Sequence, residues 1–103
     1  MTYYADASER GLLIEGLRAL AAYLQDNPDV PAPRRIDMLV FALEGTNDER
    51  RAEVDVIAAR IGAETHDNGS GHFAASRFFG PVEYRAVAIC EPGKTENQRK
   101  VVT

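Results

Sequence analysis

A chain of 103 residues with a formal net charge of −4 has room for one domain and carries no broad attraction for nucleic acid or anionic membranes. Its hydrophobic fraction of 45% and charged fraction of 27% are typical of a folded protein and exclude disorder along the whole length. A single cysteine excludes an internal disulfide and metal sites built from several cysteines. With no signal peptide and no apolar run long enough to cross a bilayer, we expect a cytoplasmic protein without membrane contact.

The first expected element is a helix that begins after Asp6 and stops at Asn27-Pro28. Asp6 and Glu9 have the spacing of a capping box, in which each side chain accepts a hydrogen bond from the backbone of the other residue. Leucines at helical spacing form one apolar stripe along it: Leu13, Leu17, Leu20 and Leu24. The proline-containing residues 29–35 predict a stiff linker after this helix.

The next two elements are a strand and a second helix. Residues 36–44 are the expected strand, and its residues 38–43 are apolar on both faces. This pattern predicts a central strand that is covered on both sides, with a partner subunit as one candidate cover. Thr46 and Glu49 form a second capping box, and Gly62 is expected to end the helix that follows.

The rest of the chain has the pattern of three strands joined by tight turns. The strands are expected at residues 63–67, 72–79 and 82–90, with turns at Asn68–Gly71 and Gly80-Pro81. The order helix, strand, helix, strand, strand, strand predicts one α+β domain over residues 1–93. We expect a four-stranded, mainly antiparallel sheet with two helices packed on one face. The polar residues 94–103 predict a flexible tail.

One cluster of residues has the composition of a metal or acid–base site. His66, Asp67 and His72 lie around the expected turn, and two imidazoles with a carboxylate can bind zinc or transfer protons. Polar residues that decorate an exposed turn are the simpler interpretation. We therefore expect no metal and no cofactor, and a small enzyme using these three residues is the third hypothesis for function.

A second group combines arginines with aromatic side chains. Arg77 and Arg85 lie on the last two strands, where they are interleaved with phenylalanine and tyrosine. Single-stranded nucleic-acid binders use such surfaces for stacking and phosphate contact, and Arg34 and Arg35 would add to this surface. The acidic net charge argues against this alternative.

The favoured hypothesis is protein association through the last two strands. If Phe73, Phe79, Val82 and Tyr84 share the sheet face that no helix covers, they form an apolar surface that a monomer would not leave in water. A homodimer that buries this face is the simplest solution, with a further protein partner as an extension. The predicted binding residues are Phe73, Arg77, Phe79, Tyr84 and Arg85.

Three segments carry a resemblance that extends over most of the chain: residues 15–20 with Tyr23-Leu24, residues 27–31 and residues 79–89. They resemble a group of small actinobacterial proteins of the Streptomyces type, some of them phage-associated, for which no activity is established. The resemblance implies a similar α+β domain in a bacterial cytosol and transfers no catalytic residue. Mobile-element proteins of this size often cover another protein's surface, so we expect a non-enzymatic protein-binding adaptor, regulator or inhibitor.

Overall fold

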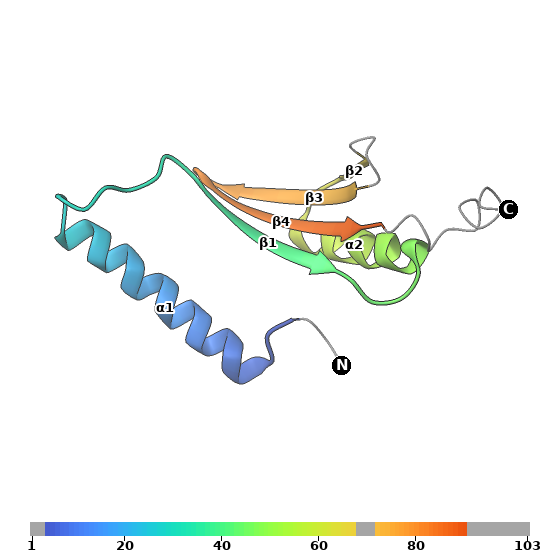
Figure 1. Ribbon diagram of the computed structural model, residues 1–103, viewed down its shortest axis with the longest axis horizontal. Coiled ribbons are helices and arrows are strands. Elements are labelled where there is room, and N and C mark those ends of the chain that lie inside the picture. The colour runs from blue at the N-terminus through green and yellow to red at the C-terminus, as the bar shows by residue number, and fades with distance from the viewer. Residues whose placement is uncertain (1–3, 68–71, 91–103) are drawn as a thin grey trace, which may run out of the picture. The chain divides into compact units, whose positions relative to one another are not determined.

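The computed structural model describes residues 4–67 and 72–90, so the expected turn Asn68–Gly71 and the expected tail 94–103 lie outside the described residues. The chain divides into two compact units, residues 1–34 and residues 35–103. The first unit contains α1 (Ala7–Asp26). The second contains the other elements (Figure 1), which are β1 (Ile36–Ala42), α2 (Asn47–Ile61), β2 (Thr65–Asp67), β3 (His72–Phe79) and β4 (Val82–Ile89). The α+β class and the predicted element order are confirmed, whereas a single domain over residues 1–93 stays a prediction.

Local hydrogen bonds fix both ends of α1. The Glu9 backbone N–H donates to Asp6 Oδ1 at 2.8 Å, and the Asp6 N–H donates to Glu9 Oε1 at 3.0 Å, which confirms the capping box. At the other end the Asn27 side-chain amide donates to the Tyr23 carbonyl at 2.8 Å. No residue of α1 is buried, so its leucine stripe is exposed along its length except at the half-buried Leu24.

The four strands form one mixed sheet in the order β1-β4-β3-β2. β2, β3 and β4 make the expected antiparallel meander, while β4 runs parallel to β1. The prediction that residues 36–44 form a central strand is wrong, because β1 lies at an edge of the sheet. The central place belongs to β4, which inserts between β1 and β3 and buries Ala86, Val87 and Ala88.

Gly80-Pro81 joins β3 and β4 as predicted and sets the register of three strands. Gly80 has a φ of +61°, a left-handed conformation that a glycine adopts without steric cost. The turn brings Phe79 opposite Val82, and the Pro81 carbonyl accepts a hydrogen bond from the Ile36 N–H at 3.1 Å. The same turn therefore fixes β4 against β3 and β1 against β4.

Helix α2 begins at the predicted capping box and ends at the predicted glycine. The Glu49 N–H donates to Thr46 Oγ1 at 3.1 Å, the Thr46 N–H donates to Glu49 Oε1 at 2.7 Å, and Gly62 adopts a φ of +71°. Neither this helix nor α1, the two helices of the described chain, is long and apolar enough to cross a membrane.

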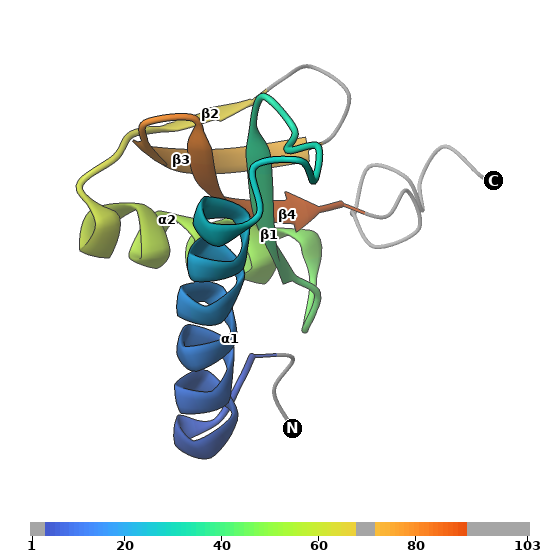
Figure 2. The same ribbon diagram turned by 90° about the vertical axis from the view of Figure 1, so that its left-hand side faces the viewer.

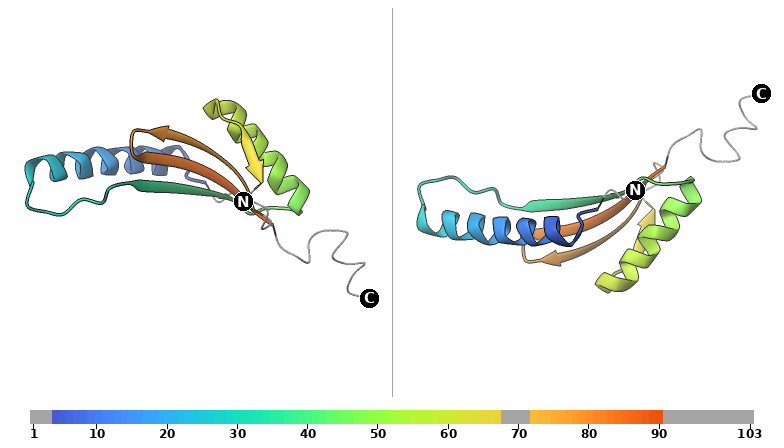
Figure 3. Two further views of the ribbon diagram at one scale, coloured as in Figure 1. Left: turned by 90° about the horizontal axis from the view of Figure 1, so that it is seen from above. Right: turned by 90° about the horizontal axis from the view of Figure 1, so that it is seen from below.

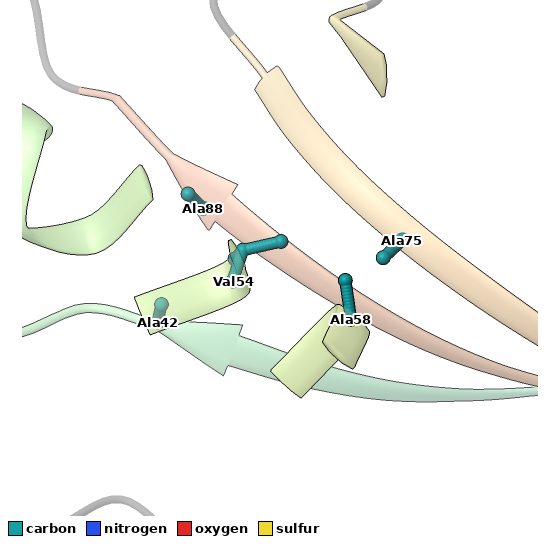
Figure 4. Packing of buried hydrophobic residues seen from close by; sticks show 5 residues of the cluster. All are labelled: Ala42, Val54, Ala58, Ala75 and Ala88. Atoms are coloured by element: carbon teal, nitrogen blue, oxygen red, sulfur yellow. The ribbon is translucent and has the colours of Figure 1, made fainter. Parts of the chain in front are cut away.

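The core lies between α2 and one face of the sheet. Figure 4 shows its small side chains together: Ala42, Val54, Ala58, Ala75 and Ala88. Because four of these five are alanines, the helix can approach the strands closely. Figures 2 and 3 show α2 on one side of the sheet, crossing the end remote from the β3–β4 turn. One half of this face is thus covered by α2, and the half beside the turn is not.

Candidate functional site: an apolar patch beside the β3–β4 turn

The half of the face that α2 leaves uncovered carries mostly apolar side chains. Side chains alternate along a strand, so the residues that share a face with the buried Ala42, Ala75 and Ala88 follow from the register. Two rows across β1, β4 and β3 lie beyond the helix. We name them the hairpin-end patch, which consists of Ile36, Val82, Phe79, Met38, Tyr84 and Arg77.

Exposure is highest at the turn. The Phe79 side chain is 58% exposed, Ile36 is 42% exposed and Val82 is 37% exposed, while Met38 and Tyr84 are half-buried. The Arg77 guanidinium carbon lies 5.1 Å from the centroid of the Phe79 ring, within the range of a cation–π contact. The patch is therefore an apolar surface that carries a single cation.

The predicted binding residues are only partly brought together. Phe73, Arg77, Phe79 and Tyr84 share one face, but it is the face against which α2 packs. Phe73 lies at the covered end and packs against the core. Arg85 pairs with Ser76 in the register and lies on the opposite face. These aromatic residues therefore do not form an apolar surface on the face opposite α2, as the dimer hypothesis required. The exposed part of the group is instead the turn-proximal end of the helix-covered face.

A polar network that the sequence analysis missed lies on the opposite face. Its centre is Glu83, which is only 5% exposed. Glu83 Oε1 accepts a hydrogen bond from Arg35 Nη2 at 2.7 Å, and Oε2 accepts one from Ser76 Oγ at 2.5 Å. Arg85 Nη1 lies 3.5 Å from the same Oε2, and Arg35 Nη2 also donates to Asp37 Oδ1 at 2.9 Å. The buried carboxylate is thus compensated by two cations and a hydroxyl group, as a buried charge requires.

Two of the arginines proposed for phosphate contact, Arg35 and Arg85, are paired with Glu83 in this network. The hydrogen bond to Asp37, and then the charges of Asp37 and Glu83, raise the pKa of the Arg35 guanidinium, so it remains fully charged. Arg77 lies on the other face, and Arg34 belongs to the other compact unit. The hairpin register is the signal that could have revealed the network, since it places Ser76, Glu83 and Arg85 on one face.

The histidine cluster is divided between the two faces of the sheet. His66 pairs with Ala74 in the register and shares its face with His72, whereas Asp67 pairs with Phe73 on the α2 face. There Asp67 Oδ2 lies 3.8 Å from Arg51 Nη2. Within residues 4–67 and 72–90, no three His, Cys, Asp or Glu side chains are grouped so that they could hold a metal ion.

Two arginines of α2 join the helix to the end of the sheet. Arg50 is buried, and its Nη1 donates to the Ile89 carbonyl at 2.8 Å. Arg51 lies 5.8 Å from the centroid of the Phe73 ring, and a hydrogen bond to the Cys90 side chain is the largest cause that raises its pKa. Arg50 and Arg51 thus hold α2 against the covered end of the sheet, where Cys90 is half-buried.

Comparison with known proteins adds no relative, because no family model, no curated protein and no solved structure matches the chain.

Proposed function

We propose that the protein is a non-enzymatic protein-binding module, acting as an adaptor, regulator or inhibitor in a bacterial cytosol, and that the hairpin-end patch is its binding surface. The observation that carries the proposal is the uncovered half of the α2 face, where Phe79, Ile36 and Val82 expose apolar surface side by side. A contiguous exposed apolar surface of this kind is typical of an interaction site.

The composition of the patch supports a protein partner. Aromatic residues, methionine and arginine are enriched at the centres of protein interfaces, and the patch contains all three classes in Phe79, Tyr84, Met38 and Arg77. The Arg77 guanidinium is already held over the Phe79 ring, so less conformational entropy would be lost when a partner covers both. The bacterial cytosolic setting rests on the resemblance to the actinobacterial group.

The chain offers a matched pair of variants to test this surface. Phe78 and Phe79 are neighbours with almost equal exposure, 60% and 58%, and they lie on opposite faces of β3. Phe79→Ser removes the ring from the patch, and Phe78→Ser removes an equally exposed ring from the other face. The tagged wild-type protein and both variants would be used to capture partners from a nuclease-treated Streptomyces lysate.

The proposal predicts one stoichiometric protein on the wild type and on Phe78→Ser. Truncation of a central interface aromatic costs about 2 kcal/mol, so Phe79→Ser should bind this protein roughly 30-fold more weakly. Equal capture by both variants would show that the patch is not the binding surface. A partner that appears only without nuclease would favour the nucleic-acid alternative instead.

A further inference from the structure

The outer edge of β1 presents backbone groups that have no strand beside them in the described part of the chain, where β4 is its one neighbour. The Ile36 N–H points inward, because it donates to the Pro81 carbonyl beside β4. Backbone groups point to alternate sides along a strand, so those of Asp37, Leu39 and Phe41 point outward. Such an edge is a template for pairing with another strand.

β1 has only one of the side-chain features with which proteins block an exposed edge, a charge. Its sequence, Ile-Asp-Met-Leu-Val-Phe-Ala, contains no lysine and no proline. Its single charge, Asp37, is already paired with Arg35 at 2.9 Å. The side chains of both faces are otherwise apolar, and Leu39 is 49% exposed in the middle of the strand. A seven-residue strand with six apolar side chains is an aggregation hazard unless another strand covers it.

We propose that β1 pairs with β1 of a second copy of the chain, antiparallel and centred on Leu39, so that two four-stranded sheets join into one continuous sheet. This inference deepens the proposed binding function by naming one partner, a second copy, and it uses a different surface from the hairpin-end patch.

The strand is complementary to itself in this register. Leu39 would pair with Leu39 of the second copy, Met38 with Val40, and Ile36 with Ala42, so apolar side chains meet along the strand. Asp37 would lie opposite Phe41, which keeps the two carboxylates away from each other. Because Leu39 points its backbone groups outward, the two copies of Leu39 would exchange both N–H···O=C bonds at the two-fold axis.

The faces of the two sheets match as well. Met38 and Val40 both lie on the α2 face, since they share it with the buried Ala42. Their pairing would therefore place both α2 helices on the same side of the joined sheet. On the other face Leu39 would meet Leu39 of the second copy, and Phe41 of the second copy would lie opposite Asp37, at the edge of the Glu83 network.

Light scattering on the full chain tests the pairing, with three variants. Leu39→Lys places two positive charges opposite each other at the axis, and the exposed side chain allows the substitution in a folded monomer. Leu39→Pro removes an outward N–H without removing a hydrogen bond to β4. Val56→Lys adds the same charge at a comparably exposed position of α2 and serves as the control.

The wild type and Val56→Lys should have twice the chain mass of 11.3 kDa, and Leu39→Lys should have the mass of one chain with an unchanged circular dichroism spectrum. If Leu39→Pro does not fold, Leu39→Lys decides the result. A monomeric wild type across the concentration series, or a Leu39→Lys variant that remains dimeric, would overturn the pairing. The proposed function has a separate test, because a monomer that captures its partner through Phe79 would refute only the dimer.

Discussion

The strongest quantitative prediction concerns Val54, which is fully buried and is the largest such side chain in the core. The other buried members of its cluster are alanines, whose short side chains cannot extend into a cavity. Val54→Ala removes two methyl groups, at about 0.8 kcal/mol each for the lost transfer free energy. The unfilled cavity adds to this, so the free energy of unfolding should fall by about 2 kcal/mol.

Val56→Ala is the matched control, because Val56 lies in the same helix and is 53% exposed. Both substitutions gain the same helix propensity, so the difference between them isolates burial. For a domain of this size a loss of about 2 kcal/mol lowers the Tm by roughly 10 °C, which thermal circular dichroism and urea titration measure. Equal free energies of unfolding for Val54→Ala and Val56→Ala would show that Val54 does not lie in the core.

Two further substitutions test other parts of the second unit. Thr46→Ala removes the hydroxyl that accepts a hydrogen bond from the Glu49 N–H, so the free energy of unfolding measured by urea titration should fall by about 1 kcal/mol. An unchanged midpoint of unfolding would show that this cap does not stabilise α2. Glu83→Ala leaves the Ser76 hydroxyl without its acceptor and should lower the free energy of unfolding by about 1–3 kcal/mol. Glu83→Gln keeps an acceptor there and should lower it less. Equal losses for the two variants would show that the network does not depend on this hydrogen bond.

Local signals in the sequence predicted local structure well. The capping boxes at Asp6 and Thr46, the helix end at Gly62 and the turn at Gly80-Pro81 all occur where the pattern indicates. Each of these features depends on hydrogen bonds or dihedral angles within a few residues, so the local sequence is enough to predict it. The antiparallel pairing of β3 with β4 follows from the Gly80-Pro81 turn.

The positions that depend on distant pairing were harder to predict. Strand β1 is apolar on both faces, as a central strand is, yet it lies at an edge because β4 inserts beside it. Alternation within the hairpin could show that Phe73, Phe79 and Tyr84 share a face, but not which face α2 would cover. The Arg35–Glu83 contact joins residues 48 positions apart, and no local pattern encodes it.

Amide hydrogen exchange along β1 is the most direct test of the pairing of two chains, since it measures the protection of each backbone N–H at this edge. The amides of Met38 and Val40 point toward β4 and should be protected at every concentration, whereas those of Leu39 and Phe41 should become protected only as the protein concentration rises. Leu39 and Phe41 amides that exchange freely at all concentrations, beside protected amides at Met38 and Val40, would contradict the pairing of two chains through this edge.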